Sequence, residues 1–249
     1  MATRSQLLTA CDGLLQPQRF KDYGPNGLQV EGKPQIRRLV SGVTASLALI
    51  DAAIEQGADA ILVHHGLFWR GQDGRVNGWM KQRLARLLAH DINLLAYHLP
   101  LDAHPELGNN AQLAQRFAIP VQGSFGDQDL GLWGTAPNPD PAAFIAQAHR
   151  LFGREPIVVC PDPQRPWRRI GWCSGGAQGY FEAAIAAGVD AFVTGEISEP
   201  QAHLARETGV AFLACGHHAT ERWGAPAVAA RLAQGLGLQH KFIDIPNPA

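Results

Sequence analysis

Apolar and polar residues follow one another in blocks that predict short buried strands separated by amphipathic helices. The apolar run 39–43 predicts a strand, and residues 47–54 then place apolar side chains at helical spacing. Gly57 follows this stretch, where a helix commonly ends in the left-handed conformation that glycine tolerates. The continuous apolar run 60–63 comes next and predicts a strand that is buried on both faces. The pattern over residues 39–63 is therefore that of a strand–helix–strand unit.

The same pattern occurs twice in the chain. Segment 37–65 aligns without a gap on segment 168–196, and the two share identical residues at the pairs Arg37/Arg168, Ala52/Ala183, Ile54/Ile185, Gly57/Gly188, Asp59/Asp190 and Ala60/Ala191. A repeat of this length and order indicates an internal duplication. We expect the two segments to superimpose, with Gly57 and Gly188 at equivalent helix ends.

The remaining blocks extend each copy in a similar way. Helices are predicted at 3–15, 80–90, 110–117, 140–152, 199–207 and 219–234, and strands at 92–97, 210–214 and 241–245. Strands that alternate with helices indicate the α/β class, here as two repeats with parallel or mixed sheets. We expect the first repeat over 1–124, with segment 219–249 packing back on it, and the second over 125–218. The Pro- and Gly-rich stretch 119–140 is predicted to be the joint between them.

Composition and charge narrow the class of protein. The 249 residues carry a formal net charge of -1 and are 46% apolar, as in an ordinary globular protein. This even charge balance gives no strong signal for nucleic-acid binding. The amino-terminal residues lack the apolar core of a signal peptide, and no stretch reaches the roughly 18 apolar residues that a membrane helix needs. We therefore expect a cytoplasmic protein with no membrane partner.

The four cysteines are scattered along the chain, and none of them forms a CxxC pair. Such spacing argues against a structural zinc site and against a disulfide framework. We interpret all four as reduced and mostly buried thiols: Cys11, Cys160, Cys173 and Cys215.

Candidate ligands gather just after three predicted strands, where open α/β sheets commonly bind their ligands. The pair His64–His65 ends one apolar run, and the glycine that follows allows the backbone to bend so that both imidazoles serve one cluster. Asp102 follows the next strand and adds a carboxylate. If a helix begins near His217, this residue and Glu221 share one face at the spacing by which helices present paired metal ligands.

Each of these groups has a plainer interpretation when it is taken alone. An HH pair is more often not a ligand site, an aspartate after a strand commonly caps a turn or helix, and a His–Glu pair on a helix is commonly a surface pair. Together they supply three imidazoles and two carboxylates, about the set that two cations sharing a carboxylate need. The sequence therefore predicts a dinuclear site for divalent ions, with Zn, Fe, Mn, Co and Ni all compatible.

The glycine-rich segment 173–179 (CSGGAQG) lies between a predicted strand and a predicted helix. Backbone N–H groups at such a turn can bind a phosphate, with Ser174, Gly175 and Gly176 as the candidates. The segment matches neither a Walker A motif nor GxGxxG. A tight strand-to-helix turn without a ligand is the alternative interpretation.

Several motifs resemble those of a known family over nearly the whole chain. They are DYGPNGLQVEGK (22–33), GVTAS (42–46), GADAILVHHGLFW (57–69), HDINLLAYHLPLDAHPELGNNAQLA (90–114), DAFVTGEISE (190–199), GHHATER (216–222) and FIDIPNPA (242–249). The sequence resembles the YbgI-type GTP cyclohydrolase I type 2 homologues of the NIF-three-like family. The resemblance implies two intertwined repeats of an αβ(βα)3-like unit, and ring-shaped homohexamers with the metals facing an internal cavity.

The same resemblance implies the ligand set of two divalent metal ions per chain. Carried over residue by residue, the ligands are His64, His65, Asp102, His217 and Glu221. In the family pattern His64 and His217 bind one ion, His65 and Asp102 bind the other, and Glu221 bridges the two.

Two functions stay open at this point. One is a metal-dependent hydrolase for a nucleotide or a related phosphorylated heterocycle, with damaged nucleotides as one substrate class that the family suggests. His98 and His218 are then candidates for general acid–base groups, or equally for residues that orient a ligand. The other is a metal carrier, metal inserter or regulatory scaffold, which would hold the same metals without turnover.

Overall fold

The structure of the protein is a computed structural model that describes residues 1–249, and its contacts divide the chain into two compact units. Unit 1 comprises residues 1–108 and 224–246, and unit 2 comprises residues 109–223 and 247–249. The sequence-based division had its boundaries at 124/125 and 218/219 instead. Each unit is a mixed α/β structure, as predicted, and is described below by itself.

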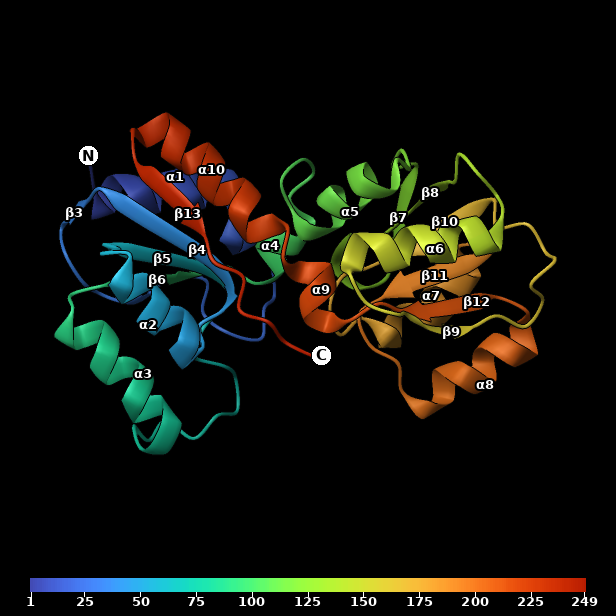
Figure 1. Ribbon diagram of the computed structural model, residues 1–249, viewed down its shortest axis with the longest axis horizontal. Coiled ribbons are helices and arrows are strands. Elements are labelled where there is room, and N and C mark those ends of the chain that lie inside the picture. Colours follow the sequence, from blue (N-terminus) through green and yellow to red (C-terminus); the bar gives the residue numbers. More distant parts are fainter. The chain divides into compact units, whose positions relative to one another are not determined.

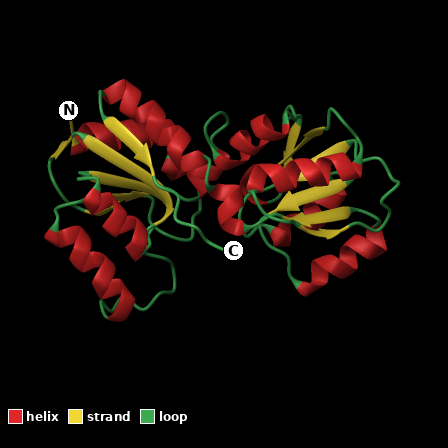
Figure 2. Cartoon of the chain, viewed as in Figure 1, coloured by secondary structure: helices red, strands yellow, loops and turns green.

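Unit 1 contains a five-stranded sheet, a two-stranded ribbon and helices on both faces of the sheet (Figures 1 and 2). Its strands are β1 (Ala2–Thr3), β2 (Gly27–Val30), β3 (Gln35–Ile36), β4 (Arg38–Thr44), β5 (Ala60–His65), β6 (Asn93–Ala96) and β13 (Gln239–Phe242). Its helices are α1 (Arg4–Leu15), α2 (Leu47–Glu55), α3 (Gly78–Ala89), α4 (Leu99–Ala103) and α10 (Gly224–Leu236).

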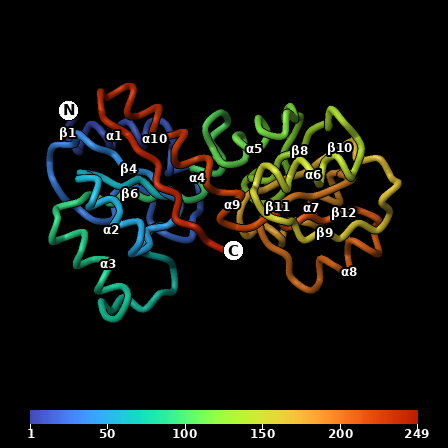
Figure 3. The backbone as a smooth tube through the Cα atoms, in the orientation of Figure 1, coloured from blue at the N-terminus to red at the C-terminus, as the bar shows by residue number.

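The unit 1 sheet has the strand order β13-β4-β5-β6-β2, in which only β2 is antiparallel to its neighbour. Its central strand β5 is apolar on both faces because helices cover both. Ile61 and Val63 face the core formed with α2 and α3, whereas Ala60 and Leu62 face the core formed with α1 and α10. This alternation explains the continuous apolar run in the sequence. The last strand, β13, pairs in parallel with β4, so the end of the chain and its first third lie side by side (Figure 3).

Unit 2 contains a six-stranded sheet with the order β7-β8-β10-β11-β12-β9. Its strands are β7 (Gly123–Phe125), β8 (Gly131–Thr135), β9 (Ile157–Val159), β10 (Arg169–Trp172), β11 (Ala191–Thr194) and β12 (Ala211–Ala214). Its helices are α5 (Asn109–Phe117), α6 (Pro141–Phe152), α7 (Phe181–Ala186), α8 (Glu199–Thr208) and α9 (His217–Glu221). The three central strands β10, β11 and β12 run parallel. Strands β8 and β9 pair antiparallel to them, and β7 pairs antiparallel to β8.

The two strand–helix–strand segments of the internal repeat have the same local structure. In each, one helix connects two strands that pair in parallel with each other. These units are β4–α2–β5 in unit 1 and β10–α7–β11 in unit 2. Gly57 and Gly188 end the two helices with φ of 63° and 74°, the left-handed conformation that was predicted for both.

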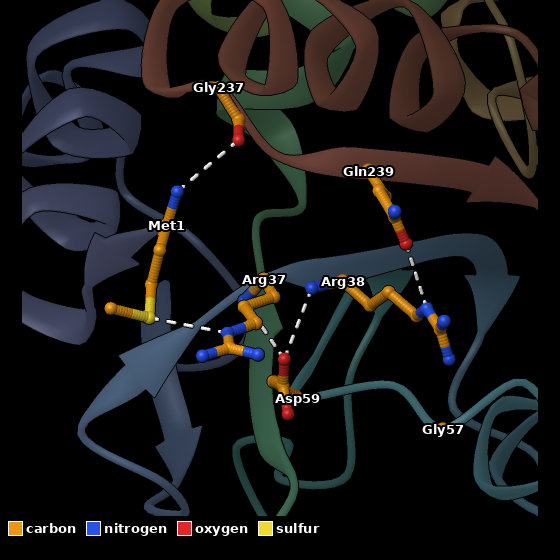
Figure 4. Close-up of a pocket in the computed structure, with 7 residues that line it drawn as sticks. All are labelled: Met1, Arg37, Arg38, Gly57, Asp59, Gly237 and Gln239. Atoms are coloured by element: carbon orange, nitrogen blue, oxygen red, sulfur yellow. Dashed lines mark hydrogen bonds between the residues drawn. The ribbon is translucent and has the colours of Figure 1, made fainter.

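A hydrogen-bond arrangement at the start of two strands is also repeated in both units. In unit 1, Asp59 accepts hydrogen bonds from the backbone N–H groups of Arg37 and Arg38 at 2.8 and 3.1 Å (Figure 4). In unit 2, Asp190 accepts the same pair of bonds from residues 168 and 169, both at 2.9 Å. Asp59 lies just before the amino end of β5, whereas His65 lies at the carboxyl end of the same strand. A pocket of about 640 Å³ adjoins Asp59 in unit 1 and is therefore at the opposite end of β5 from His65.

Two expectations about the chain's organisation were wrong. Stretch 119–140, which we predicted to be a joint, contains β7 and β8, because Phe125 and Leu130 are buried and fold the stretch into the unit 2 sheet. The single helix predicted over 219–234 is two helices, α9 and α10. Pro226 explains the break, since its ring would clash with the carbonyl of Arg222 in a continuous helix and it lacks an N–H to donate.

The helices give no sign of a membrane span, as none of them combines the length and the apolar character that crossing a bilayer requires.

Candidate functional site

His64 and His65 lie at the carboxyl end of β5, where the strand ends. Their ring centroids are 4.5 Å apart, so both rings lie in one place, as predicted, although the strand continues through His65 and the chain bends only after it, at Leu67. Gly66 is required here by a close approach: a Cβ at this position would lie 2.3 Å from Oε1 of Gln29. Gln29 in turn accepts a hydrogen bond from the N–H of Leu67 and fixes the turn after the two histidines.

Both imidazoles are oriented by hydrogen bonds at their Nδ1 atoms. Nδ1 of His64, which is fully buried, donates to the backbone oxygen of Tyr97 at 3.2 Å. Nδ1 of His65 lies 3.1 Å from the hydroxyl of Thr44, the residue that pairs with it on the neighbouring strand β4. Metal-binding histidines characteristically use their second nitrogen in this way, since such a bond fixes the ring orientation.

His98 joins these two histidines from the end of β6. Its ring centroid lies 4.9 Å from that of His64 and 5.7 Å from that of His65. Ligand atoms of all three histidines lie within 4.8 Å of one another. We call these three side chains the unit 1 histidine cluster. Asp102, on α4, adds a buried carboxylate whose Oδ2 is 3.5 Å from Nε2 of His64.

Asp22 supports this cluster from a loop that no local sequence pattern links to it. Its buried carboxylate lies 2.7 Å from Nδ1 of His98 and also accepts hydrogen bonds from Asn26, Tyr23 and the N–H of Leu99. Burial raises the pKa of this carboxyl, but the bonds from His98, Asn26 and Tyr23 outweigh burial and lower it below its ordinary value. Nothing in the spacing links residues 22 and 98, and only the motif DYGPNG drew attention to this loop.

The predicted pair on unit 2 is formed as expected. Helix α9 carries His217 and Glu221 one turn apart, with His217 Nε2 at 3.1 Å from Glu221 Oε2. The other ring nitrogen, Nδ1, lies 2.6 Å from Oε1 of Glu196, the residue that the repeat alignment places opposite His65. Burial lowers the pKa of His217, but the hydrogen bonds and charges of Glu221 and Glu196 outweigh burial and raise it to about 9.

The glycine-rich segment 173–179 packs against this pair. Gly175 has φ of 69°, and a Cβ there would lie 1.9 Å from Oε1 of Glu221. Its N–H donates to the Thr220 hydroxyl at 2.9 Å, and the N–H of Ser174 donates to Asn110 at 2.8 Å. The backbone N–H groups of Ser174 and Gly175, two of the three candidate phosphate contacts, thus already donate to side chains of unit 2. These bonds hold the segment against helix α9 and Asn110. Phosphate binding by Ser174, Gly175 and Gly176 stays a prediction.

His218 and the four cysteines are the remaining residues that the sequence analysis named. His218 is nearly buried on α9, and its N–H donates to the backbone oxygen of Ala249 at 3.1 Å. The four cysteines form no disulfide, and none of them belongs to a group of side chains that could hold a metal ion.

Known proteins resemble this chain along its full length. A Pseudomonas aeruginosa protein described as "GTP cyclohydrolase 1 type 2 homolog" is 53% identical over 249 residues, which cover 98% of each chain. An Escherichia coli K12 protein of the same description is 49% identical over 231 residues, which cover 92% of this chain and 93% of that one. The solved structure described as "Structural genomics, protein ybgI, unknown function" is similar with a TM-score of 0.96 and 46% identity, covering all of both chains.

A family model gives the same assignment. The model of the Duf34/NIF3 (NGG1p interacting factor 3) family matches residues 2–248. Together with relatives that are about half identical over nearly their whole length, this match shows that the chain belongs to the Duf34/NIF3 family.

Proposed function

We propose that this chain is a hydrolase that uses two divalent metal ions and acts on a nucleotide or a related phosphorylated heterocycle. The ligands proposed from the family pattern are His64, His65, Asp102, His217 and Glu221. The observation that carries the proposal is the unit 1 histidine cluster: imidazoles with their Nδ1 atoms engaged, next to the buried carboxylate of Asp102.

The donor set fits transition metals. Imidazole suits Zn, Fe, Co and Ni, and carboxylates extend the choice to Mn. In unit 2, His217 and Glu221 offer a further imidazole and carboxylate, and Glu196 holds the imidazole in place. A protonated imidazole cannot bind a metal, so loading of His217 has to release its proton.

A pair of bound divalent ions supplies a water activated near neutral pH and a charge that polarises the bond under attack. The protein's own residues orient the donors and exclude water from them, since His64 and Glu221 are almost completely buried. His218, which is buried on the same short helix as His217 and Glu221, stays a candidate acid–base group.

The descriptions of the relatives support the proposed substrate class. They are described as homologues of a GTP cyclohydrolase, which favours a nucleotide-related substrate. The purine ring and triphosphate of GTP define the first compounds to test, and oxidised or deaminated nucleotides define the second set.

Activity screening tests the proposal. Purified protein is stripped with a chelator, reloaded with Zn, Mn, Fe, Co or Ni, and assayed against nucleotides and phosphorylated heterocycles. We expect turnover that the chelator abolishes, that a reloaded metal restores, and that Glu221→Gln removes. Metal that is held but exchanges readily, with no turnover of any of these compounds and with capture of a client protein, would replace the hydrolase by a metal carrier or scaffold.

We also propose that the chain forms a ring-shaped homohexamer in the cytoplasm, as the family resemblance implies. Native mass spectrometry of the metal-loaded protein measures the number of copies directly. A stable monomer or dimer at micromolar concentration would contradict this assembly.

A further inference from the structure

We propose that the pocket beside Asp59, at the amino end of β5, binds an elongated polyanion: the phosphate chain of an oligophosphate or of a nucleotide. The volume of this pocket, about 640 Å³, is that of a small-molecule site, and Arg37, Arg38 and Gln239 belong to its lining (Figure 4). The candidate metal ligands of unit 1 lie at the other end of β5. The inference therefore goes beyond the proposed function and requires neither a metal nor turnover.

The lining of this pocket carries positive charge that its own carboxylate does not balance. Asp59 is the only acidic side chain in the lining, and both of its oxygens are engaged. Oδ1 lies 3.1 Å from Nζ of Lys33, and Oδ2 accepts the backbone N–H groups of Arg37 and Arg38. Because Lys33 balances the charge of Asp59, the two guanidinium charges remain to attract an anion.

Hydrogen bonds hold the Arg38 side chain in the pocket wall and leave part of its guanidinium unused. Nε donates to Oε1 of Gln239 and Nη1 donates to the backbone oxygen of Gln56, both at 2.9 Å. The parallel pairing of β13 with β4 places Gln239 directly opposite Arg38. Nη2 forms no hydrogen bond within the protein. A guanidinium that is already fixed loses little conformational entropy when it binds an anion.

Arg37 offers its guanidinium on the other side of Asp59 (Figure 4). Its Nε contacts only the sulfur of Met1, a weak acceptor 3.3 Å away, and its two terminal nitrogens have no partner in the protein. The two guanidinium groups diverge, one toward Met1 and the other toward Gln239. A ligand that reaches both has to be elongated. A phosphate chain has this shape, and its oxygens match the forked N–H groups of arginine.

The second repeat has the corresponding arginine in a different setting. Arg169 donates Nη1 to the equivalent backbone oxygen, that of Ala187, at 2.9 Å. Its guanidinium lies over the ring of Trp133 on the neighbouring strand β8, 4.3 Å from the ring centroid. The shared bond thus supports a helix end in both units, whereas an aromatic ring covers the guanidinium in unit 2 and a pocket adjoins it in unit 1.

The test measures binding of inorganic tripolyphosphate to the full chain by isothermal titration, after metals have been stripped and the chelator removed. We expect one tripolyphosphate per chain, with an affinity that falls as the salt concentration rises. Arg37→Gln keeps the backbone N–H that Asp59 accepts, and should lower the affinity by about 10-fold or more, the loss expected for charge-assisted hydrogen bonds. Arg168→Gln, at the equivalent position of the second repeat, is the matched control and should bind like the wild type.

A second pair of variants tests the same pocket without changing an arginine. A Cβ at Gly237, which belongs to the lining, meets no atom within 4 Å. The φ of 64° at this position is one that asparagine and aspartate tolerate better than other residues. Gly237→Asp adds a negative charge and should bind tripolyphosphate several-fold more weakly than Gly237→Asn. Equal affinities of these two variants, or wild-type affinity in folded Arg37→Gln protein, would overturn the site.

GTP and guanosine distinguish the two sources of the phosphate chain, each compared between the wild type and Arg37→Gln. Tighter binding of GTP than of tripolyphosphate, lost in Arg37→Gln, identifies a nucleotide, and equal binding identifies a free oligophosphate. Guanosine that binds as tightly as GTP overturns the phosphate chain as the ligand. A wild-type chain that binds no tripolyphosphate overturns this inference alone, whereas a lack of metal-dependent turnover overturns only the hydrolase.

Discussion

Nδ1 of His217 lies 2.6 Å from Oε1 of Glu196, a residue at the end of the second repeat where the first repeat has its histidine pair. Glu196 occupies the position that corresponds to His65 in the first repeat. It does not belong to the predicted ligand set, and instead orients His217, a predicted ligand on helix α9. The two copies thus have the same local fold, whereas the residues at the ends of the equivalent strands have taken different roles.

Glu196→Gln should therefore weaken metal binding without removing a ligand. The neutral amide holds the imidazole less firmly and no longer raises its basicity, so we expect metal affinity to fall by about 10–100-fold. Isothermal titration of the chelator-stripped protein with Zn measures the effect. The matched control is Glu199→Gln, an exposed residue on α8 that pairs only with His203 on the surface. Equal affinities for the two variants would contradict the orienting role.

The sequence predicted the positions of the candidate ligands on two segments, because each segment depends on local patterns. The end of a buried strand followed by glycine places His64 and His65, and helical spacing places His217 over Glu221. Pro226 in the first turn of α10 could also have predicted the break after α9.

The partners of these residues could not be predicted from local patterns. Asp22 reaches His98 from a loop 76 residues earlier, and Glu196 reaches His217 from 21 residues earlier. Such pairs form only when the sheets bring separate strand ends together. The membership of α5 in unit 2 has the same origin: Phe117 stacks on Phe144 of α6, a contact that neither helix's own pattern reveals.

Replacing all four cysteines by alanine should leave the metal content near that of the wild type. The thiolate is the form that binds metals. Burial, together with the charge of Asp12, raises the pKa of Cys11 to about 12, and burial raises that of Cys215 to about 12 despite Arg154. Elemental analysis of the purified quadruple variant checks this. Loss of metal together with the cysteines would show that the ligands are assigned wrongly.

Glu221→Gln should remove at least one metal per chain and leave the fold intact. The amide keeps the shape of this buried side chain but removes the charge that the family pattern assigns to a bridge between two ions. Elemental analysis gives the metal content, and circular dichroism gives the fold. Two tightly held metals in this variant would rule out the bridge and shift attention to Asp102 or His218.

Asp59→Asn should destabilise the protein in a pH-dependent way. Burial raises the pKa of Asp59, but hydrogen bonds from the N–H groups of Arg37 and Arg38 and from Lys33 outweigh it and lower the pKa. A lowered folded-state pKa stabilises the fold above the ordinary pKa of about 3.9, and this stabilisation is lost as the pH falls through the folded-state value. We expect a loss of about 1–2 kcal/mol at pH 7 from the weakened hydrogen bonds.

Urea unfolding of Asp59→Asn and wild type at pH 7 and near pH 3 measures this difference, which should shrink at the lower pH. Asp51→Asn is the control, because Asp51 and its partner Arg86 are both exposed and such pairs contribute little. A difference between Asp59→Asn and wild type that is the same at both pH values would mean that the charge of Asp59 is not what stabilises the two strand starts.

Gly175→Ala should impair both stability and metal binding, because the glycine is required twice over. Its φ of 69° costs an alanine about 1–2 kcal/mol, and the added Cβ would lie 1.9 Å from Oε1 of Glu221. The carboxylate has to move away, so the geometry that His217 and Glu221 present to a metal is lost. Gly179→Ala, in the same segment, meets nothing within 4 Å and should leave both properties near wild type. Zn titration and thermal unfolding of both variants separate the two effects: if Gly175→Ala loses stability but binds Zn with wild-type affinity, the segment supports the fold of unit 2 and does not position Glu221.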